Sequence, residues 1–150
     1  MGAICWDKPQ YFIGNELKNT DPSKENTPNL NRLAKQEYCY LTTTGRVTGN
    51  PHEIEIWFGL NEATLYMLSG GGEASDWVKN LRHNASVNVR IGKEKFKGRA
   101  RFVSKGEEDK MARHLLAGKY QGWREGRRLS EWARTALTVA VDLEILVINK

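Results

Sequence analysis

Three consecutive glycines, Gly70 to Gly72, follow an apolar run and precede Trp77 in the stretch TLYMLSGGGEASDWVKNL. Glycine loses more backbone entropy on folding than any other residue, so three in a row need a physical reason. A backbone without Cβ atoms lets a planar ring approach closely, its amides stabilise negative charge on that ring, and a tryptophan offers a large flat face. A flexible connector above a core tryptophan is also compatible with this stretch, which leaves both interpretations open.

A second stretch, TTTGRVTG at residues 42–49, combines hydroxyl side chains, two glycines and Arg46. Exposed backbone amides and a guanidinium bind a phosphate dianion through charge-assisted hydrogen bonds. The same residue types also suit an ordinary hairpin loop with a solvated arginine. The stretch therefore predicts either a phosphate-binding loop or a plain turn.

Length and composition limit the class of protein. The chain has 150 residues, the size of one domain, and we expect an N-terminal arm at residues 1–25 and the folded domain at residues 26–150. Its two cysteines, Cys5 and Cys39, form no CxxC pair, so we expect no disulfide framework, no metal site and a reducing, cytoplasmic setting. The sequence shows no signal-peptide core and no membrane span. The net charge of +5 permits an anionic partner.

Hydrophobic periodicity predicts a mainly β domain with peripheral helices. Residues that alternate at period two, or that are rich in aromatic and β-branched types, predict six antiparallel strands, at 38–44, 52–58, 63–68, 86–91, 95–103 and 135–148. The last of these is apolar throughout and is expected to be buried on both faces. Helical spacing predicts helices at 28–34, 75–83 and 105–120, with a helical turn at 129–133 and a non-helical turn at 59–62. Hairpin connections predict a small barrel with added helices, and neither GxGxxG nor a P-loop is present.

The stretches YLTTTGRVTGNPHEIEIWF, LYMLSGGGEASDWVKNLRHNASVNVRI and WARTALTVAVDL together resemble the nitroreductase-type family of deazaflavin-dependent oxidoreductases. That family lies in the superfamily of split β-barrels that also holds the FMN-dependent pyridoxamine-phosphate oxidases, and the resemblance covers residues 28–148. It implies a six-stranded antiparallel split β-barrel of the FMN-binding type and a homodimer. It also implies cofactor F420 as hydride donor to a small organic acceptor of the nitro, quinone or enone type.

The resemblance also implies where the cofactor lies. The loop at 46–48 would contact its phosphate and acidic tail, and the strand at 52–57 would pass beside the deazaflavin. The segment at 67–70 would meet the ring's polar edge, and the helix start at 76–80 would cover it. The implied cofactor-binding residues are Thr44, Gly45, Arg46, Val47, Thr48, His52, Ile54, Trp57, Met67, Leu68, Ser69, Gly70, Gly71, Asp76, Trp77, Lys79 and Asn80. Ser69 and Tyr120 are the candidate catalytic residues, and the resemblance also implies that Tyr120 shapes the substrate pocket. The proton could come from Ser69, Tyr120 or solvent, with His52 as a further candidate because a histidine ordinarily titrates near neutral pH.

Several alternatives stay open from the sequence. Family members often carry a lysine after the serine of the SGG segment and a second basic residue after the loop arginine, whereas this chain has Gly70 and Val47. Fewer positive charges weaken the grip on an acidic tail, which keeps an FMN-dependent reductase or oxidase on the same barrel as an alternative. A non-catalytic carrier of flavin, haem or fatty acid is a further one. Nucleic-acid binding is disfavoured because acidic residues interrupt the basic clusters around Arg101 and Arg127.

Overall fold

The computed structural model describes residues 29–145. Residues 30–144 form one compact unit, which is described here by itself. The predicted arm at 1–25 and the last part of the predicted strand, residues 146–148, lie outside the described residues. In the described part of the chain, no helix is long and apolar enough to cross a membrane.

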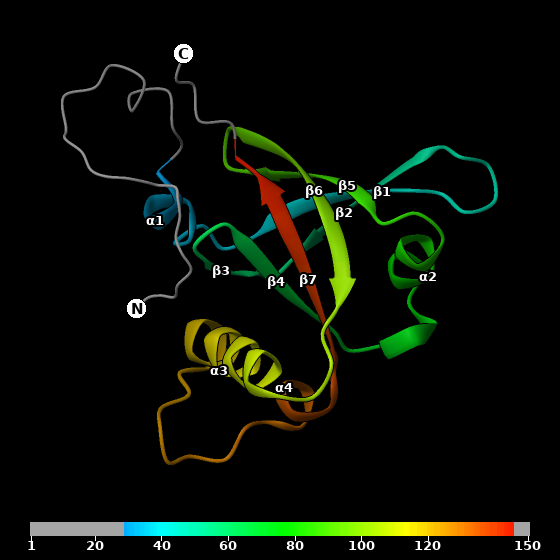
Figure 1. Ribbon diagram of the computed structural model, residues 1–150. Helices are drawn as coiled ribbons and strands as arrows, with labels where there is room; N and C mark the ends of the chain where they lie inside the picture. Colours follow the sequence, from blue (N-terminus) through cyan, green and yellow to red (C-terminus); the bar gives the residue numbers. More distant parts are fainter. Residues whose placement is uncertain (1–28, 146–150) are drawn as a thin grey trace, which may run out of the picture. The chain divides into compact units, whose positions relative to one another are not determined.

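The unit is built on one antiparallel sheet of seven strands in the order β2-β1-β5-β6-β7-β4-β3 (Figure 1). The strands are β1 (Cys39–Thr44), β2 (Pro51–Ile56), β3 (Gly59–Asn61), β4 (Thr64–Ser69), β5 (Ser86–Ile91), β6 (Glu94–Phe102) and β7 (Leu137–Glu144). Every neighbouring pair is antiparallel, and the predicted hairpins β1–β2 and β5–β6 are confirmed. The antiparallel fold class predicted from the sequence is also confirmed.

The predicted number of strands, six, is wrong because the segment 59–62 is not only a turn. Gly59 to Asn61 pair with Thr64 to Tyr66, which leaves a turn of two residues, Glu62 and Ala63. Glu62 adopts φ 57, a conformation that glycine or asparagine adopts more readily than glutamate. The short strand β3 contains glycine and asparagine, which are typical of turns, so the sequence predicts a turn at this place.

Four helices flank the sheet, within a few residues of their predicted positions: α1 (Leu30–Leu33), α2 (Asp76–His83), α3 (Glu107–Gln121) and α4 (Glu131–Thr135). Helix α2 packs against β1, whereas α3 packs against β3, β4 and β7 and contacts α4 (Figure 1). Helix α3 begins with three acidic residues, which interact favourably with the positive end of the helix dipole. Its C-cap is Gly122 in the left-handed conformation, which glycine adopts readily.

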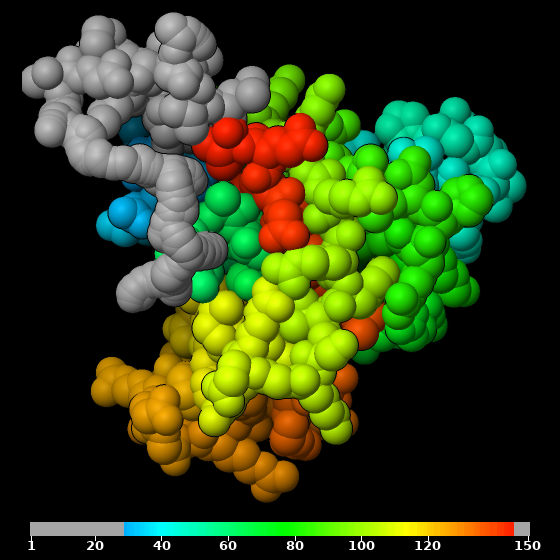
Figure 2. Space-filling view, viewed as in Figure 1, coloured from blue at the N-terminus to red at the C-terminus, as the bar shows by residue number. Residues whose placement is uncertain are grey.

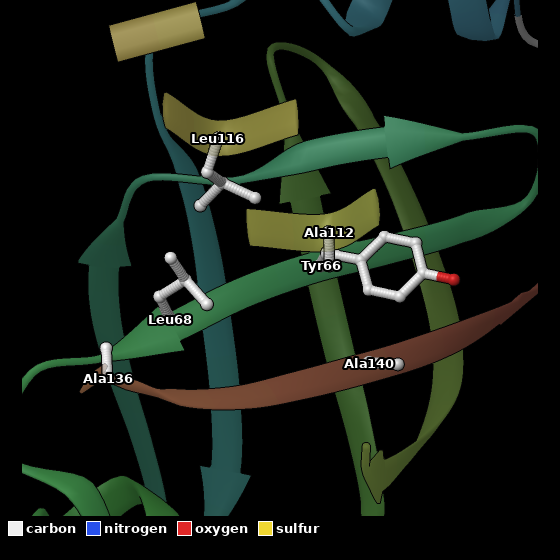
Figure 3. Close-up of a cluster of buried hydrophobic side chains, with 6 residues drawn as sticks. All are labelled: Tyr66, Leu68, Ala112, Leu116, Ala136 and Ala140. Atoms are coloured by element: carbon white, nitrogen blue, oxygen red, sulfur yellow. The ribbon is translucent and has the colours of Figure 1, made fainter. Parts of the chain in front are cut away.

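A hydrophobic cluster joins α3 to the sheet (Figure 3). Ala112 and Leu116, spaced four residues apart on α3, face Tyr66 and Leu68 of β4, and all four side chains are buried. Residues 65–69 of β4 are buried without interruption. The strand is therefore covered on both faces, which hides its side chains from a ligand at the surface.

The final strand is buried on both faces only in its first half. Residues 138–141 of β7 are buried, whereas Asp142 and Glu144 are exposed. The prediction that the whole apolar run is buried is therefore wrong for the end of β7, where one face reaches solvent.

Candidate functional site

The loop between β1 and β2 is fastened to helix α2 through Arg46. Arg46 Nη1 donates to Asn80 Oδ1 at 2.8 Å, and Arg46 Nη2 lies 3.2 Å from Asp76 Oδ1. The Arg46 backbone amide also donates to Asn80 Oδ1, at 3.2 Å. In Figure 2 the loop (cyan) and the segment that leads into α2 (green) form neighbouring parts of the surface. Arg46 therefore meets two other residues of the predicted cofactor set, Asp76 and Asn80, that lie 30 and 34 positions later in the sequence.

Asn80 is the anchor of this contact. Its side chain is buried, and its Nδ2 donates to the hydroxyl of Thr43 on β1 at 3.1 Å. One amide group thus satisfies Thr43, the Arg46 guanidinium and the Arg46 backbone. A buried amide needs such partners. Asn80 therefore fixes the loop through the Arg46 backbone amide, and it fixes the end of the Arg46 side chain through the guanidinium.

The remainder of the loop closes on itself. Gly45 N donates to Asn50 O at 2.7 Å, and the Thr48 hydroxyl accepts from Asn50 N at 3.2 Å. A Cβ on Gly45 would lie only 2.6 Å from His52 Nε2, so the imidazole lies directly against this glycine. Val47 is exposed at 87% of its surface. The loop is therefore a formed hairpin turn that presents Arg46 toward α2.

The glycine segment is partly explained by its own packing. A Cβ on Gly71 would lie 2.6 Å from Ser75 Oγ, and Gly72 adopts φ +59 at the start of a short 3₁₀ helix, Gly72–Ala74. Ser69 is buried, with its hydroxyl 3.2 Å from Gly72 O and 2.9 Å from Ser75 Oγ. The Gly70 and Gly71 backbone itself is exposed. A ligand can thus reach bare main chain here, while the Ser69 hydroxyl is engaged within the loop.

The remaining predicted residues divide into two groups. Trp77 is half-buried and Lys79 exposed on α2, beside the Arg46 contact, and Thr44 is half-buried at the end of β1. Ile54 on β2 is also half-buried and belongs to this first, accessible group. The second group is Met67 and Leu68, which are buried in β4, so their side chains point into the core.

An aromatic cluster borders the glycine segment. Trp57 stacks on Tyr120 with ring centroids 4.3 Å apart and meets Trp132 of α4 edge-to-face at 5.5 Å. A Cβ on Gly70 would lie 3.4 Å from Trp132 Cδ1. Trp132 was not among the predicted site residues. Its neighbours in space come from the β2–β3 connection, α3 and the β4–α2 connection, which no sequence spacing reveals.

The Tyr120 hydroxyl is held by backbone. It lies 2.7 Å from Glu37 O and 3.0 Å from Phe58 O, and it accepts from Phe58 N at 3.0 Å. Burial raises the pKa of Tyr120 to about 12. A hydroxyl with this pKa and these partners fixes the ring beside Trp57, and it is a poor proton donor near neutral pH.

Lys119 is a second residue that sequence reasoning missed. Its Nζ donates to Phe58 O at 3.0 Å and lies 3.7 Å from the centroid of the Phe58 ring. Burial lowers the pKa of this ammonium from 10.5 to about 8. A lone lysine at the end of a helix carries no such signal in sequence, because its burial depends on Phe58, which lies 61 residues earlier.

This pKa predicts a pH dependence of stability. Below about pH 8 Lys119 is protonated in both the folded and unfolded states, and its burial cost is constant. As the pH rises from about 8 toward 10.5, the folded state loses its proton first, so the unfolded state binds more protons and the free energy of unfolding rises. Denaturant unfolding between about pH 7 and 9 is therefore expected to show wild type gaining stability relative to Lys119→Met.

The matched control is Lys110→Met, an exposed lysine on the same helix. The difference in free energy of unfolding between wild type and Lys110→Met should stay flat over the same range. A flat difference for Lys119→Met as well would show that the Lys119 ammonium is not desolvated.

The donor set around the loop fits an anionic cofactor with a planar head. The Arg46 side chain is one-third exposed, the Lys79 ammonium is exposed, and the bare backbone of Gly70 and Gly71 is open to solvent. Cationic side chains suit phosphate and carboxylate groups, and main chain without Cβ atoms suits the approach of a flat ring. No group of three or more His, Cys, Asp or Glu residues that could hold a metal occurs in residues 29–145.

The fold defines a class, the split β-barrel proteins. One such solved structure, from Listeria innocua, is assigned as a pyridoxamine 5′-phosphate oxidase; it has TM-score 0.60 and 18% identity over 86% of this chain and 99% of its own. Another, an F420-H2 dependent reductase (FDR-A), has TM-score 0.55 and 20% identity over 70% of this chain and 93% of its own. A third, described as a domain-swapped dimer, has TM-score 0.55 and 21% identity over 72% of this chain and 80% of its own. At these identities the likeness shows the fold.

The chain belongs to the F420H(2)-dependent quinone reductase family, whose model matches residues 18–144. No curated protein matches it. The protein is therefore an oxidoreductase with F420 as its cofactor, and the family, the enzyme class and the cofactor predicted from the sequence are confirmed.

Proposed function

We propose that the protein uses reduced F420 to reduce planar organic acceptors, with quinones as the acceptor class. The observation that carries the proposal is the order of groups along one side of the site. Arg46 pairs with Asp76 at the start of α2, the adjacent Ser75 lies beside Gly71, and Gly70 lies beside Trp132, which meets Trp57 edge-to-face. Cations lie at one end, bare backbone in the middle and aromatic rings at the other, which matches an anionic tail, a flat ring and an apolar acceptor.

At the cationic end, Arg46 and Lys79 would hold the phosphate and acidic tail of the cofactor, with Asn80 fixing the arginine. The exposed main chain of Gly70 and Gly71 would lie against the ring, with Trp77 beside it. When bound, the reduced deazaflavin supplies a hydride, so the protein must position it and exclude water rather than provide a nucleophile.

At the aromatic end, the Trp57 and Trp132 rings would receive the acceptor. Both residues are half-buried, so part of each stays exposed to solvent, although Tyr120 covers one face of the Trp57 ring. Flat apolar acceptors gain from stacking on such rings and from leaving water. A nitro or enone acceptor without an aromatic ring gains less from this wall, which favours quinones among the three predicted types.

Reduction of a quinone also needs a proton. The Tyr120 hydroxyl is held by backbone with a raised pKa, and the Ser69 hydroxyl is engaged by Gly72 O and Ser75 Oγ. We therefore propose solvent, rather than Ser69 or Tyr120, as the proton source. Tyr120→Phe is expected to leave the turnover number with a quinone within about twofold, because the hydroxyl takes no part in the transition state.

The proposal is tested by titration and turnover. Tryptophan fluorescence of the protein should saturate with F420 and respond far less to FMN or FAD, with Trp77→Phe as the control for the reporting ring. Oxidation of reduced F420 should then depend on a soluble quinone. Preferential binding of FMN, or tight F420 binding without turnover on quinone, nitro and enone acceptors, would contradict the proposed function.

We also propose that the protein is a cytoplasmic homodimer. The structural neighbour described as a domain-swapped dimer supports self-association, and the free, buried thiol of Cys39 suits a reducing compartment. Light scattering coupled to gel filtration should give twice the mass of the chain. A monomer at micromolar concentration would contradict the dimer.

A further inference from the structure

We propose that Asp76 competes with the cofactor for Arg46, an inference that rests on the proposed function. The Asp76 carboxylate lies on Arg46 Nη2 at 3.2 Å, where a phosphate or carboxylate of the ligand would bind. This role differs from the one that the resemblance implies, in which Asp76 covers the cofactor. An anion must displace this carboxylate before it gains the full guanidinium.

The two partners of Arg46 differ in how firmly they hold it. Asn80 is 4% exposed, bonds the arginine at 2.8 Å and is fixed by Thr43. The Asp76 side chain is 85% exposed, and it makes one longer contact to the guanidinium. Asn80 is therefore a fixed anchor, whereas Asp76 can turn into solvent while the loop stays in place.

The local charges explain why a carboxylate lies here in the free protein. Asp76 is the first residue of α2, where an acidic side chain stabilises the positive end of the helix dipole. It also neutralises Arg46 beside that end. An incoming dianion would meet the same two positive features, so the carboxylate occupies the subsite that the ligand needs.

The size of the effect follows from the exposure of the pair. Exposed ion pairs bias an equilibrium by a factor of about five at most. If the state with Asp76 paired to Arg46 is favoured by that factor, only the minor state with a free guanidinium binds the anion fully. The apparent dissociation constant for the anion then rises in inverse proportion to the population of that minor state. Removing the carboxylate should therefore tighten binding about two- to fivefold.

The test compares Asp76→Asn with Glu73→Gln. Both remove one negative charge from the same segment, but Glu73 pairs with Arg82, with Arg82 Nη2 2.6 Å from Glu73 Oε2, and not with Arg46. Wild type and both variants would be titrated with F420 by fluorescence and with inorganic pyrophosphate by the rise in unfolding temperature. Asp76→Asn is expected to bind both ligands about two- to fivefold more tightly than wild type, and Glu73→Gln to match wild type within about 1.5-fold.

The outcomes separate this inference from the proposed function. If Asp76→Asn binds neither ligand more tightly than Glu73→Gln does, the competition is refuted, whatever wild type binds. If wild type and Asp76→Asn fail to bind F420 but Asp76→Asn gains affinity for pyrophosphate over Glu73→Gln, the competition stands and the cofactor assignment fails. The unliganded Asp76→Asn protein should also unfold at a slightly lower temperature than wild type, because it has lost the ion pair.

Discussion

Replacing Arg46 with glutamine is expected to weaken F420 binding by about 10- to 100-fold. A hydrogen bond to a charged group contributes about 1.5–3 kcal/mol, and each 1.4 kcal/mol is about tenfold in affinity. The loop should keep its position, because the Arg46 backbone amide still donates to Asn80 Oδ1. Fluorescence titration gives the dissociation constant, and the unfolding temperature of the free variant reports whether the loop is retained.

Arg82→Gln is the matched control for this change. Arg82 lies on the same helix as Asn80, is about half exposed, and pairs with Glu73 at a distance from the Arg46 contact. If both arginine variants weaken F420 binding equally, only the overall positive charge matters, and the anion subsite at Arg46 is refuted. Since the sequence carries a net charge of +5, this comparison is needed before any affinity change is assigned to one side chain.

Most of the sheet could be predicted from the sequence because the period-two alternation of polar and apolar residues in a strand is visible in a single sequence. The strands β2, β5 and β6 show that alternation, whereas β1 is predicted by its aromatic and β-branched residues, and all four predictions agree with the structure within a few residues. The strand β3 is too short for any period and contains turn-forming residues. Its pairing with β4 depends on the packing of α3 over both strands, which is a property of the fold.

The candidate site shows a similar division. The resemblance placed Arg46 and Asn80 in one cofactor set, and the structure joins them by hydrogen bonds across 34 positions of sequence. The resemblance also placed Met67 and Leu68 at the ligand, but their burial places their side chains in the core. A strand covered on both faces loses the alternation that would tell an inward residue from an outward one.

The same limit explains why Trp132 and Lys119 were missed. Each gains its environment from residues brought together by the fold: Trp132 from Trp57 and Gly70, and Lys119 from Phe58. Neither belongs to a motif of fixed spacing. The three glycines, in contrast, form a distinct motif in the sequence. Two of them are also required by the local structure, because a Cβ on Gly71 would clash with Ser75 and Gly72 adopts a left-handed backbone conformation.

Replacing Trp132 with leucine is expected to raise the KM for a quinone by about 3- to 10-fold while the affinity for F420 changes little. Aromatic pairs contribute about 0.5–1.5 kcal/mol beyond the area that they bury, and leucine keeps the apolar character without the ring. Trp132 also packs against the hydrophobic cluster of α3, so Trp132→Phe is needed as the conservative variant. Steady-state kinetics with a quinone, F420 titration and the unfolding temperature together separate acceptor binding from stability.

Trp123→Leu is the matched control for the loss of a tryptophan. Trp123 stacks on His114 at 4.1 Å and bonds Arg127 O, in the connection between α3 and α4. If the wall of Trp57 and Trp132 receives the acceptor, Trp132→Phe restores KM toward wild type and Trp123→Leu leaves it unchanged. An equal rise in KM for Trp123→Leu, or a loss of F420 affinity in Trp132→Leu, would contradict an acceptor site at this wall. The edge-to-face contact at 5.5 Å would then serve only to pack α4 against the connection between β2 and β3.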